Sequence, residues 1–492
     1  MAPRASKAFQ ALATPFTEAS DMHNQNRRQL PAVAWAGPRM VALLALIGSA
    51  LLLSAPAHAM NIQKVVTPKG IEAWLVEDHT LPIIATQFGF PGGATQDPAG
   101  KEGTAYFVSG MMDEGAGDIK SEQFQERLES LAIDFSFEAS RDAFTGGMKT
   151  LTKNKDEAFR LLRLALTQPR MDEDAVERVR EQISTSIKMD DEDPEKISSN
   201  AWFKLVFDGH PYANPLKGTI DSVASLTPAD LKTYVKSAFA REGLKVSVVG
   251  DITAAELAVA LDQVFGDLPE KGKLKSVPEA EWRVKSQKAS QVIPLDVPQS
   301  VVTFGQPGLK RKDPDFMAAY ILNYIIGGGG FSSVLMQEVR EKRGLCYSVY
   351  TYLYPLDRAA IFLGGVATKN EAVSQSIGVI RDELTRIAAK GPNAEELDNA
   401  KRYLTGSYAL RFDSSVKIAN TLLWMQIEDL GMDYIDRRND LVDAVTLEDV
   451  KRVAGQLIKP GHLIITVVGQ PVGLGADDKS ETAPLAVAPP RG

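Results

Sequence analysis

The chain has 492 residues, of which 44% are hydrophobic and 24% are charged, a balance that is typical of a soluble globular protein with more than one domain. Its formal net charge is −8, and this sign disfavours a nucleic-acid-binding protein, because affinity for nucleic acid depends on neutralising phosphates. The single cysteine, Cys346, excludes an intrachain disulfide and a cysteine-based zinc ribbon.

Residues 1–59 have the order of a secretory signal peptide. A run of fourteen uncharged and mostly apolar residues, 41–54, follows three arginines and precedes an Ala-His-Ala sequence that ends at Ala59. This order predicts export with cleavage after Ala59 and a periplasmic or secreted protein. The run is shorter than the roughly 20 residues that a spanning helix needs, so an uncleaved inner-membrane anchor facing the periplasm is the alternative. Nothing else in the sequence predicts contact with a membrane.

Residues 60–268 and 291–471 are predicted to form two domains with the same order of elements. Each domain begins with alternating apolar strands, the pattern of half-buried antiparallel strands, and continues with long amphipathic helices. The strands are predicted at 83–90, 133–137, 301–306 and 346–352. The helices are predicted at 155–166, 172–187, 194–207, 371–389, 394–410 and 416–430. This order predicts an α+β fold of two homologous tandem domains, each a mostly antiparallel sheet covered on one face by helices.

A linker and a tail complete the predicted domain organisation. Residues 269–290 are rich in Lys, Glu, Ser and Pro, which indicates a linker between the two domains. Residues 472–492 consist mainly of Gly, Ala, Pro and charged residues, so they are predicted to form a disordered tail that cannot bury enough apolar surface to order itself.

An internal repeat relates the two domains. Thr227 and Thr446 each precede a helical pattern, and Gly250 and Gly469 each end an apolar strand pattern. Both pairs have the same sequence offset, 219. An Asp-Pro pair near the start of each domain recurs with a sequence offset of 216, and Asp97 belongs to the first of these pairs. Two separate elements in one register indicate duplication of a single domain.

Four segments carry a resemblance to a known family. They are residues 103–112, 210–218, 327–333 and 339–348, and the most specific of them reads Arg-Glu-Lys-Arg-Gly-Leu-Cys-Tyr from Arg340. Together they resemble the pitrilysin (insulinase) family of zinc peptidases, which includes the mitochondrial processing peptidase, over about residues 62–471.

The zinc motif of that family is not preserved here. Active members carry H-x-x-E-H on the helix after the first strand, where two imidazoles bind the metal and the glutamate acts as general base. The resemblance places Tyr106, Ser109 and Gly110 at these three positions. It places Val179 at the distal acidic ligand, with Glu181 as the neighbouring alternative. We therefore expect no metal or other cofactor in this chain and zinc in a partner; a site assembled around His79 and His210 is the alternative.

Arg340 and Tyr347 are the predicted catalytic pair. Gly344 is a natural residue to end the helix that carries Arg340, and the chain then enters a strand, so the two side chains can converge over one groove. The resemblance implies that the pair acts in trans, binding substrate and transition state at the zinc of another subunit. Ordinary roles at a helix end and in a strand remain the alternative. Cys346 between them is predicted to face the core and to be inert.

The glycine run and Phe331, which follows it, are predicted to contact substrate. Gly328, Gly329 and Gly330 lack the Lys-Ser/Thr that completes a phosphate loop, so a hinge or a substrate-contacting loop at a helix N-terminus is predicted instead.

The sequence thus predicts the non-catalytic subunit of an exported, heteromeric zinc metallopeptidase. Its partners would be a catalytic insulinase-like subunit with an intact H-x-x-E-H motif and an unfolded peptide held along a sheet edge. Two alternatives remain open: a peptidase-fold scaffold or binding protein without a proteolytic role, and a metalloendopeptidase active alone through an unorthodox metal site.

Overall fold

The computed structural model describes residues 60–282 and 290–474. The predicted signal peptide, the linker residues 283–289 and the tail from residue 475 lie outside the described residues. The fold is that of the compact unit that begins at Gln63. Within the described ranges, no helix combines the length and the apolar character that crossing a bilayer requires.

The first half contains a six-stranded sheet that ends at an edge strand, β6. In spatial order its strands are β1 (Gln63–Val66), β2 (Glu72–Glu77), β8 (Lys245–Gly250), β3 (Ile83–Pro91), β7 (Ala143–Leu151) and β6 (Asp134–Ala139). Only the β2–β8 pair among them is parallel. A small hairpin of β4 (Gly115–Ala116) and β5 (Ile119–Lys120) lies apart from this sheet.

The second half contains a five-stranded sheet that ends at an edge strand, β11. In spatial order its strands are β11 (Cys346–Pro355), β12 (Ala360–Lys369), β10 (Gln299–Pro307), β13 (Ile464–Gly469) and β9 (Ser290–Pro294). Only the β13–β9 pair among them is parallel. Both sheets are therefore mostly antiparallel, and the predicted α+β class is confirmed.

Helices accompany each sheet. Those of the first half are α2 (Thr104–Met111), α3 (Ser121–Ser130), α4 (Lys155–Thr167), α5 (Glu173–Asp190), α6 (Pro194–Phe207), α7 (Ile220–Ala224), α8 (Pro228–Ala238) and α9 (Ala254–Phe265). Those of the second half are α10 (Phe316–Asn323), α11 (Val373–Lys390), α12 (Ala394–Gly406), α13 (Ser415–Ile427), α14 (Tyr434–Ala444) and α15 (Leu447–Leu457). The six predicted helices are all present. The one predicted at 394–410 ends earlier, at Gly406, and a separate 3₁₀ turn follows it.

The predicted repeat recurs in the structure. Strands β8 and β13 have equal lengths, as do helices α8 and α15, and the starts of both pairs keep the sequence offset of 219. Thr227 and Thr446 both cap their helices with a reciprocal capping box. Gly250 and Gly469 have φ values of +137° and +139°. A Cβ at Gly250 would lie 2.0 Å from a backbone oxygen, so both the conformation and the space require glycine.

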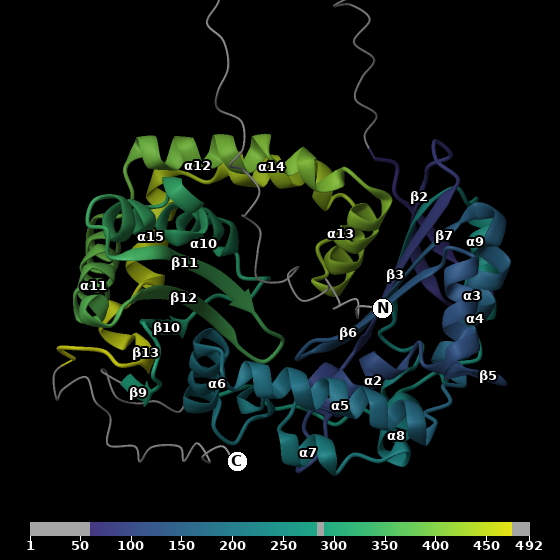
Figure 1. The fold of residues 1–492 in the computed structure, drawn as a ribbon. Helices are drawn as coiled ribbons and strands as arrows, with labels where there is room; N and C mark the ends of the chain where they lie inside the picture. The colour runs from purple at the N-terminus through teal and green to yellow at the C-terminus, as the bar shows by residue number, and fades with distance from the viewer. Residues whose placement is uncertain (1–59, 283–289, 475–492) are drawn as a thin grey trace, which may run out of the picture. The chain divides into compact units, whose positions relative to one another are not determined.

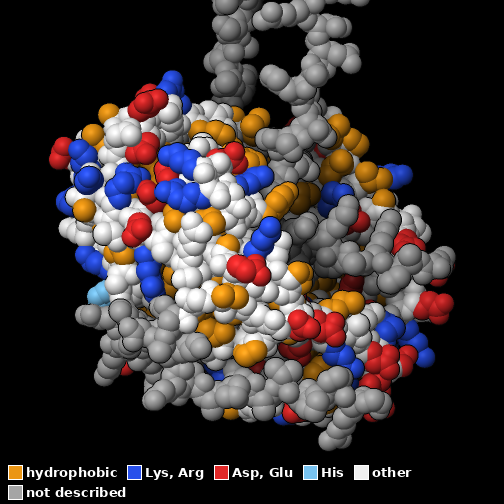
Figure 2. Space-filling model, turned by 60° about the vertical axis from the view of Figure 1, so that its left-hand side comes forward, with side chains coloured by type: hydrophobic (Ala, Val, Ile, Leu, Met, Phe, Trp, Pro, Cys, Tyr) orange, Lys and Arg blue, Asp and Glu red, His pale blue; other side chains and the backbone are white. Residues whose placement is uncertain are grey.

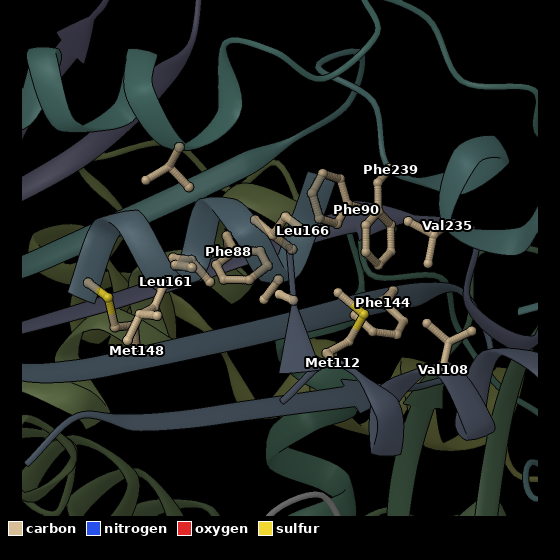
Figure 3. Packing of buried hydrophobic residues seen from close by; sticks show 14 of the residues in the cluster. Phe88, Phe90, Val108, Met112, Phe144, Met148, Leu161, Leu166, Val235 and Phe239 are labelled. Carbon is tan, nitrogen blue, oxygen red and sulfur yellow. The ribbon is translucent and has the colours of Figure 1, made fainter. Parts of the chain in front are cut away.

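Each sheet packs its own helices on one face. In the first half, Phe88, Phe90 and Phe144 of the sheet pack with Leu161 of α4 and Phe239 after α8 in one buried cluster (Figure 3). The rings of Phe90 and Phe239 stack at 4.6 Å between centroids.

The other face of each sheet is covered by a helix from the other half of the chain. The sequence did not predict this exchange of helices. Helix α6 contacts β10 and β13, and helix α13 contacts β3 and β8 (Figure 1). Thr466 Oγ1 of β13 donates to the main-chain carbonyl oxygen of Ser198 in α6 at 2.9 Å. Ser247 Oγ of β8 donates to the Ala419 oxygen of α13 at 2.6 Å. Because positions 247 and 466 have the same offset as the rest of the repeat, the two contacts are equivalent.

Candidate functional site

Arg340 lies between two exposed aromatic rings. Its guanidinium carbon is 4.6 Å from the ring centroid of Phe331 and 5.2 Å from that of Tyr347. Phe331 is 59% exposed and Tyr347 is 78% exposed. A guanidinium over aromatic faces gains cation–π attraction, which holds the three side chains together at the surface. We call Phe331, Arg340 and Tyr347 the arginine cluster.

A β-bulge directs Tyr347 into this cluster. In β11, Cys346 pairs with Thr368 and Ser348 with Ala367, so Tyr347 is an extra residue without a partner on β12. Regular alternation would place Tyr347 on the same face as Val349, which is buried. The extra residue changes the side from which Tyr347 projects. The predicted convergence of Arg340 and Tyr347 therefore depends on a local departure from strand periodicity.

Among the basic residues from 340 to 343, Arg340 has the longest ion-pair distance to an acidic side chain. It lies in a π-helical turn, Met336–Glu341, and Gly344, at φ +62°, ends this turn as the sequence predicts. The Arg340 Nε–Glu341 Oε1 distance is 3.7 Å. Lys342 and Arg343 both bind Glu338, at 2.5 and 2.7 Å. Among the described residues, the Arg340 guanidinium donates no hydrogen bond within the chain, so its N–H groups remain available to a ligand.

The three glycines are all half-buried but differ in the space around them. Gly328 belongs to a π-helical turn that follows α10, and Gly330 begins a 3₁₀ turn that leads into the next helical segment, which starts at residue 334. The run therefore connects the end of one helix to the start of another. A Cβ at Gly328 would lie 2.9 Å from Asn323 Nδ2, and one at Gly329 would lie 2.8 Å from the Tyr324 oxygen. Gly330 has φ +55° and open space around it. A Cβ therefore has room at Gly330 but not at Gly328 or Gly329.

The three zinc-motif positions lie on α2 and offer no set of metal ligands. Ser109 Oγ donates to the main-chain carbonyl oxygen of Tyr106 within the helix, at 2.7 Å. Burial raises the pKa of the Tyr106 phenol, and Asp190 and Glu138 raise it further, so the phenol stays protonated at neutral pH. A Cβ at Gly110 would lie 3.2 Å from Val179 Cγ1.

The resemblance to the family places Val179 at the distal metal-ligand position. It lies on α5, is 3% exposed and packs towards Gly110, whereas Glu181 is exposed. A phenol, a hydroxyl already used in the helix, a glycine and a valine do not fit zinc. Among residues 60–282 and 290–474, no three His, Cys, Asp or Glu side chains are grouped so that they could hold a metal ion.

The two histidines considered as an alternative site have local roles. His79 Nδ1 lies 2.6 Å from Asp251 Oδ1, and its Nε2 lies 3.6 Å from Glu77. His210 caps a 3₁₀ turn, since its ring accepts from the Tyr212 amide at 3.1 Å, and its other nitrogen lies 3.1 Å from the Pro278 oxygen.

Cys346 packs against the second core, as predicted. Burial raises the pKa of its thiol to about 11. The thiol is therefore protonated and a poor nucleophile at neutral pH.

The sequence analysis missed a row of tyrosines that continues the arginine cluster along β11. Tyr350, Tyr352 and Tyr354 share one face of this edge strand, and successive ring centroids are 6.2 Å apart. Desolvation raises the pKa of Tyr350 to about 12, so its phenol is a neutral hydrogen-bond donor. The alternating Tyr-x-Tyr-x-Tyr pattern from Tyr350 was visible in the sequence and could have identified the row.

Charge on the molecular surface is mixed. In Figure 2, Lys and Arg side chains are interspersed with Asp and Glu over the face that is shown. Such a surface does not resemble the continuous basic stripe of a nucleic-acid-binding protein.

The sequence matches models of one protein family over most of its length. A family model described as "Insulinase (Peptidase family M16)" matches residues 75–220, and one described as "Peptidase M16 inactive domain" matches residues 225–404. The "Non-peptidase homolog YmxG" of Helicobacter pylori is 27% identical over 367 residues, which cover 74% of this chain and 84% of that protein. The "Uncharacterized zinc protease YmxG" of Bacillus subtilis is 22% identical over 411 residues, covering 82% and 98%.

Two solved structures have similar folds. The crystal structure of a peptidase M16 inactive domain from Pseudomonas fluorescens matches with a TM-score of 0.78 and 28% identity, covering 84% of this chain and 98% of that one. A protease from Helicobacter pylori matches with a TM-score of 0.74 and 19% identity, covering 83% and 100%.

Proposed function

The chain belongs to the M16, or insulinase, family of peptidases and is an inactive-type member of it; from this premise we propose that it is the non-catalytic subunit of a heteromeric M16 metallopeptidase. Its partner is a catalytic M16 subunit that carries an intact H-x-x-E-H motif and the zinc. This chain contributes peptide binding and the arginine cluster.

One observation carries the proposal. The positions on α2 that bind zinc in active relatives hold no ligand set, while Arg340 and Tyr347 are together at the surface with their polar groups available. Burying an aromatic side chain stabilises a protein by roughly 1.5–3 kcal/mol. Two large rings left in solvent forgo that gain, so their exposure supports a role in binding.

The chemistry of the cluster suits an amide substrate. The planar guanidinium of Arg340 donates paired hydrogen bonds to a peptide carbonyl or a carboxylate. The phenol of Tyr347 donates to the oxyanion that develops when water adds to the scissile amide. The partner's zinc supplies the activated water. In this arrangement neither subunit hydrolyses peptides efficiently without the other.

The substrate in this proposal is an unfolded peptide that extends from the cluster along the free edge of β11. Strand β11 pairs with β12 on one side only. On its other side the Val349 amide donates to Met336 Sδ at 3.4 Å, and Gly327 lies against the Thr351 amide, so an added strand would pair with the backbone beyond Thr351. The tyrosine row from Tyr350 to Tyr354 lies on one face of this edge strand, beside the path of such a peptide.

Reconstitution tests the proposal. The chain is co-expressed with an H-x-x-E-H subunit from the same genome, and cleavage of an unfolded peptide is measured for each chain and for the mixture. We expect activity only in the mixture. In that mixture, Arg340→Ala is expected to lower kcat by about 10²-fold, while Arg343→Ala, on the same turn but paired with Glu338, leaves it unchanged. Peptide cleavage by this chain alone would contradict the proposal.

A scaffold or binding protein without a proteolytic role is the second candidate. The name "Non-peptidase homolog" of the Helicobacter pylori relative agrees with a chain that has no activity of its own in either case. The two candidates differ in the mixture: a scaffold would leave the partner's cleavage rate unchanged when Arg340 is replaced.

Export belongs to the same proposal. Residues 1–59 have the composition of a signal peptide, and cell fractionation followed by N-terminal sequencing tests it. A mature chain in the periplasm that begins at Met60 is expected. An intact leader in the membrane fraction would favour the anchored alternative.

A further inference from the structure

Arg141 is a buried arginine whose guanidinium is open to solvent on one side. It lies in the turn between β6 and β7 and is 7% exposed. Its guanidinium carbon lies 4.0 Å from the ring centroid of Phe203 on α6, and its Nη1 donates to the main-chain carbonyl oxygen of Asn214 at 3.4 Å. None of its nitrogens is among the buried polar atoms of the described residues that lack a hydrogen-bond partner. Its remaining N–H groups therefore reach solvent.

No acidic side chain of the described residues forms an ion pair with Arg141. The neighbouring carboxylate, that of Asp142, binds other groups: its Oδ1 accepts from the Tyr212 hydroxyl at 2.7 Å, and its Oδ2 accepts from the Asp357 amide at 3.1 Å. Desolvation raises the pKa of Glu138 on β6, and no arginine lowers it. A buried cation without a counter-ion is unfavourable, so this position favours an anionic ligand.

Arg141 lies at one end of the tyrosine row on β11. The ring of Phe203, over which its guanidinium stacks, meets the ring of Tyr354 edge to face at 6.3 Å between centroids. Tyr350 and Tyr352 are 45% and 36% exposed, yet desolvation raises the pKa of both phenols. Rings that water reaches although protein surrounds them line a recess. The row therefore lines a recess that leads from the arginine cluster to Arg141.

We propose that Arg141 binds a carboxylate of the peptide that lies along the tyrosine row, either its C-terminal carboxylate or that of an acidic side chain. A planar guanidinium donates two parallel hydrogen bonds to a carboxylate. Such a pair is stronger in a recess than in bulk water, because the local dielectric constant is lower. The ligand class rests on the proposed function, in which the chain binds an unfolded peptide.

Two arginines at opposite ends of the row would fix the register of the peptide. Tyr347 of the arginine cluster and Tyr354 beside Arg141 both belong to β11, and the strand between them spans about 24 Å. An extended peptide covers this distance with about seven residues. A carboxylate bound by Arg141 would thus belong to a residue about seven positions from an amide held at the arginine cluster.

Binding of three fluorescently labelled peptides to the purified chain tests the site. The peptides share one unstructured sequence without acidic residues and end in a free carboxylate, in an amide, or in an amide with one internal glutamate. By fluorescence anisotropy, at least one peptide with a carboxylate is expected to have a Kd about tenfold below that of the uncharged amide. Arg141→Met is expected to abolish this preference. Arg358→Met, which replaces an exposed arginine that lies 3.5 Å from Glu279, is expected to preserve it.

The outcomes separate this site from the proposed function. Equal Kd values for the three peptides in the unsubstituted chain would overturn the site and leave the proposed function standing, as would a preference that survives Arg141→Met. Absence of binding by all three peptides would overturn both. A preference for the carboxylate in a chain that does not activate any partner would support the site alone. Because the comparison of peptides needs no variant, it decides the matter even if Arg141→Met does not fold, which circular dichroism checks.

Discussion

Helix α2 in the first half and the arginine cluster in the second half differ in how their polar groups are used. On α2, Ser109 is bonded within its own helix, and Val179 packs against Gly110. Around Arg340, the neighbouring charges pair with one another through Glu338, and two aromatic rings remain in solvent. The groups on α2 are therefore packed or bonded within the chain, whereas the rings of the arginine cluster are exposed. Among the described residues, the chain thus combines a helix without metal ligands with an exposed arginine cluster.

The largest expected effect comes from restoring the metal position. Tyr106→His, Ser109→Glu and Gly110→His rebuild the helical motif but leave Val179 in place of the third ligand, so zinc is expected at well below one ion per chain. Adding Val179→Glu completes a set of three protein ligands, and about one zinc ion per chain is expected. Elemental analysis after desalting measures both.

Controls separate this prediction from a general gain of zinc affinity. Glu181→Gln in the four-substitution variant is expected to leave the zinc content unchanged, since Glu181 is exposed. Equal zinc in the three- and four-substitution variants would show that Val179 does not occupy the ligand position. Stoichiometric zinc in the unsubstituted chain would contradict the assignment of α2.

The next effect is the loss of one donor from the arginine cluster. Tyr347→Phe keeps the ring over Arg340 and removes only the hydroxyl. In the reconstituted enzyme, kcat is expected to fall by about 10²–10³-fold with little change in KM, because the phenol acts on the transition state. A rise in KM alone would instead assign Tyr347 to ground-state binding of the peptide.

A smaller effect tests whether the exchanged helices are equivalent in the two halves. Ser247→Ala removes one hydrogen bond from a strand to the helix of the other half. Thr466→Val removes the equivalent bond to the Ser198 carbonyl oxygen and the contact with Ser198 Oγ. Each is expected to lower the free energy of unfolding by about 1 kcal/mol, as measured by urea denaturation. An effect confined to one of the two variants would show that only one exchange stabilises the fold.

The smallest effect concerns pH and is expected in the first half alone. The hydrogen bond to Asp251 raises the pKa of His79, and the residue equivalent to Asp251 is Gln470. A raised folded-state pKa means that the stabilisation is complete below the ordinary histidine pKa and is lost as pH rises through the folded value. In NMR titrations, Asp251→Asn is expected to lower the His79 pKa towards its ordinary value. An unchanged pKa would contradict the assignment.

Local patterns in the sequence predicted most of the secondary structure. The helix predicted at 194–207 has those bounds, because Asp193 caps it before Pro194. The register of the internal repeat predicted which elements are equivalent, since Thr446 and Gly469 repeat the roles of Thr227 and Gly250. These features depend on neighbours within a few residues, so a single sequence contains the information.

Tertiary structure decided which surfaces meet. The bounds of α6 and α13 could be predicted, but not that each crosses to the other half's sheet, because amphipathicity indicates that a face is buried without indicating its partner. Regular alternation with the buried Val349 would bury Tyr347, and the bulge in β11 exposes it. The linker was predicted as a mere connection, yet the Lys273 amide donates to the Ser237 carbonyl oxygen and the Gln96 side chain binds both backbone groups of Lys275. Composition and periodicity determine what each segment can form, whereas contacts between residues hundreds of positions apart determine which of those segments become a site.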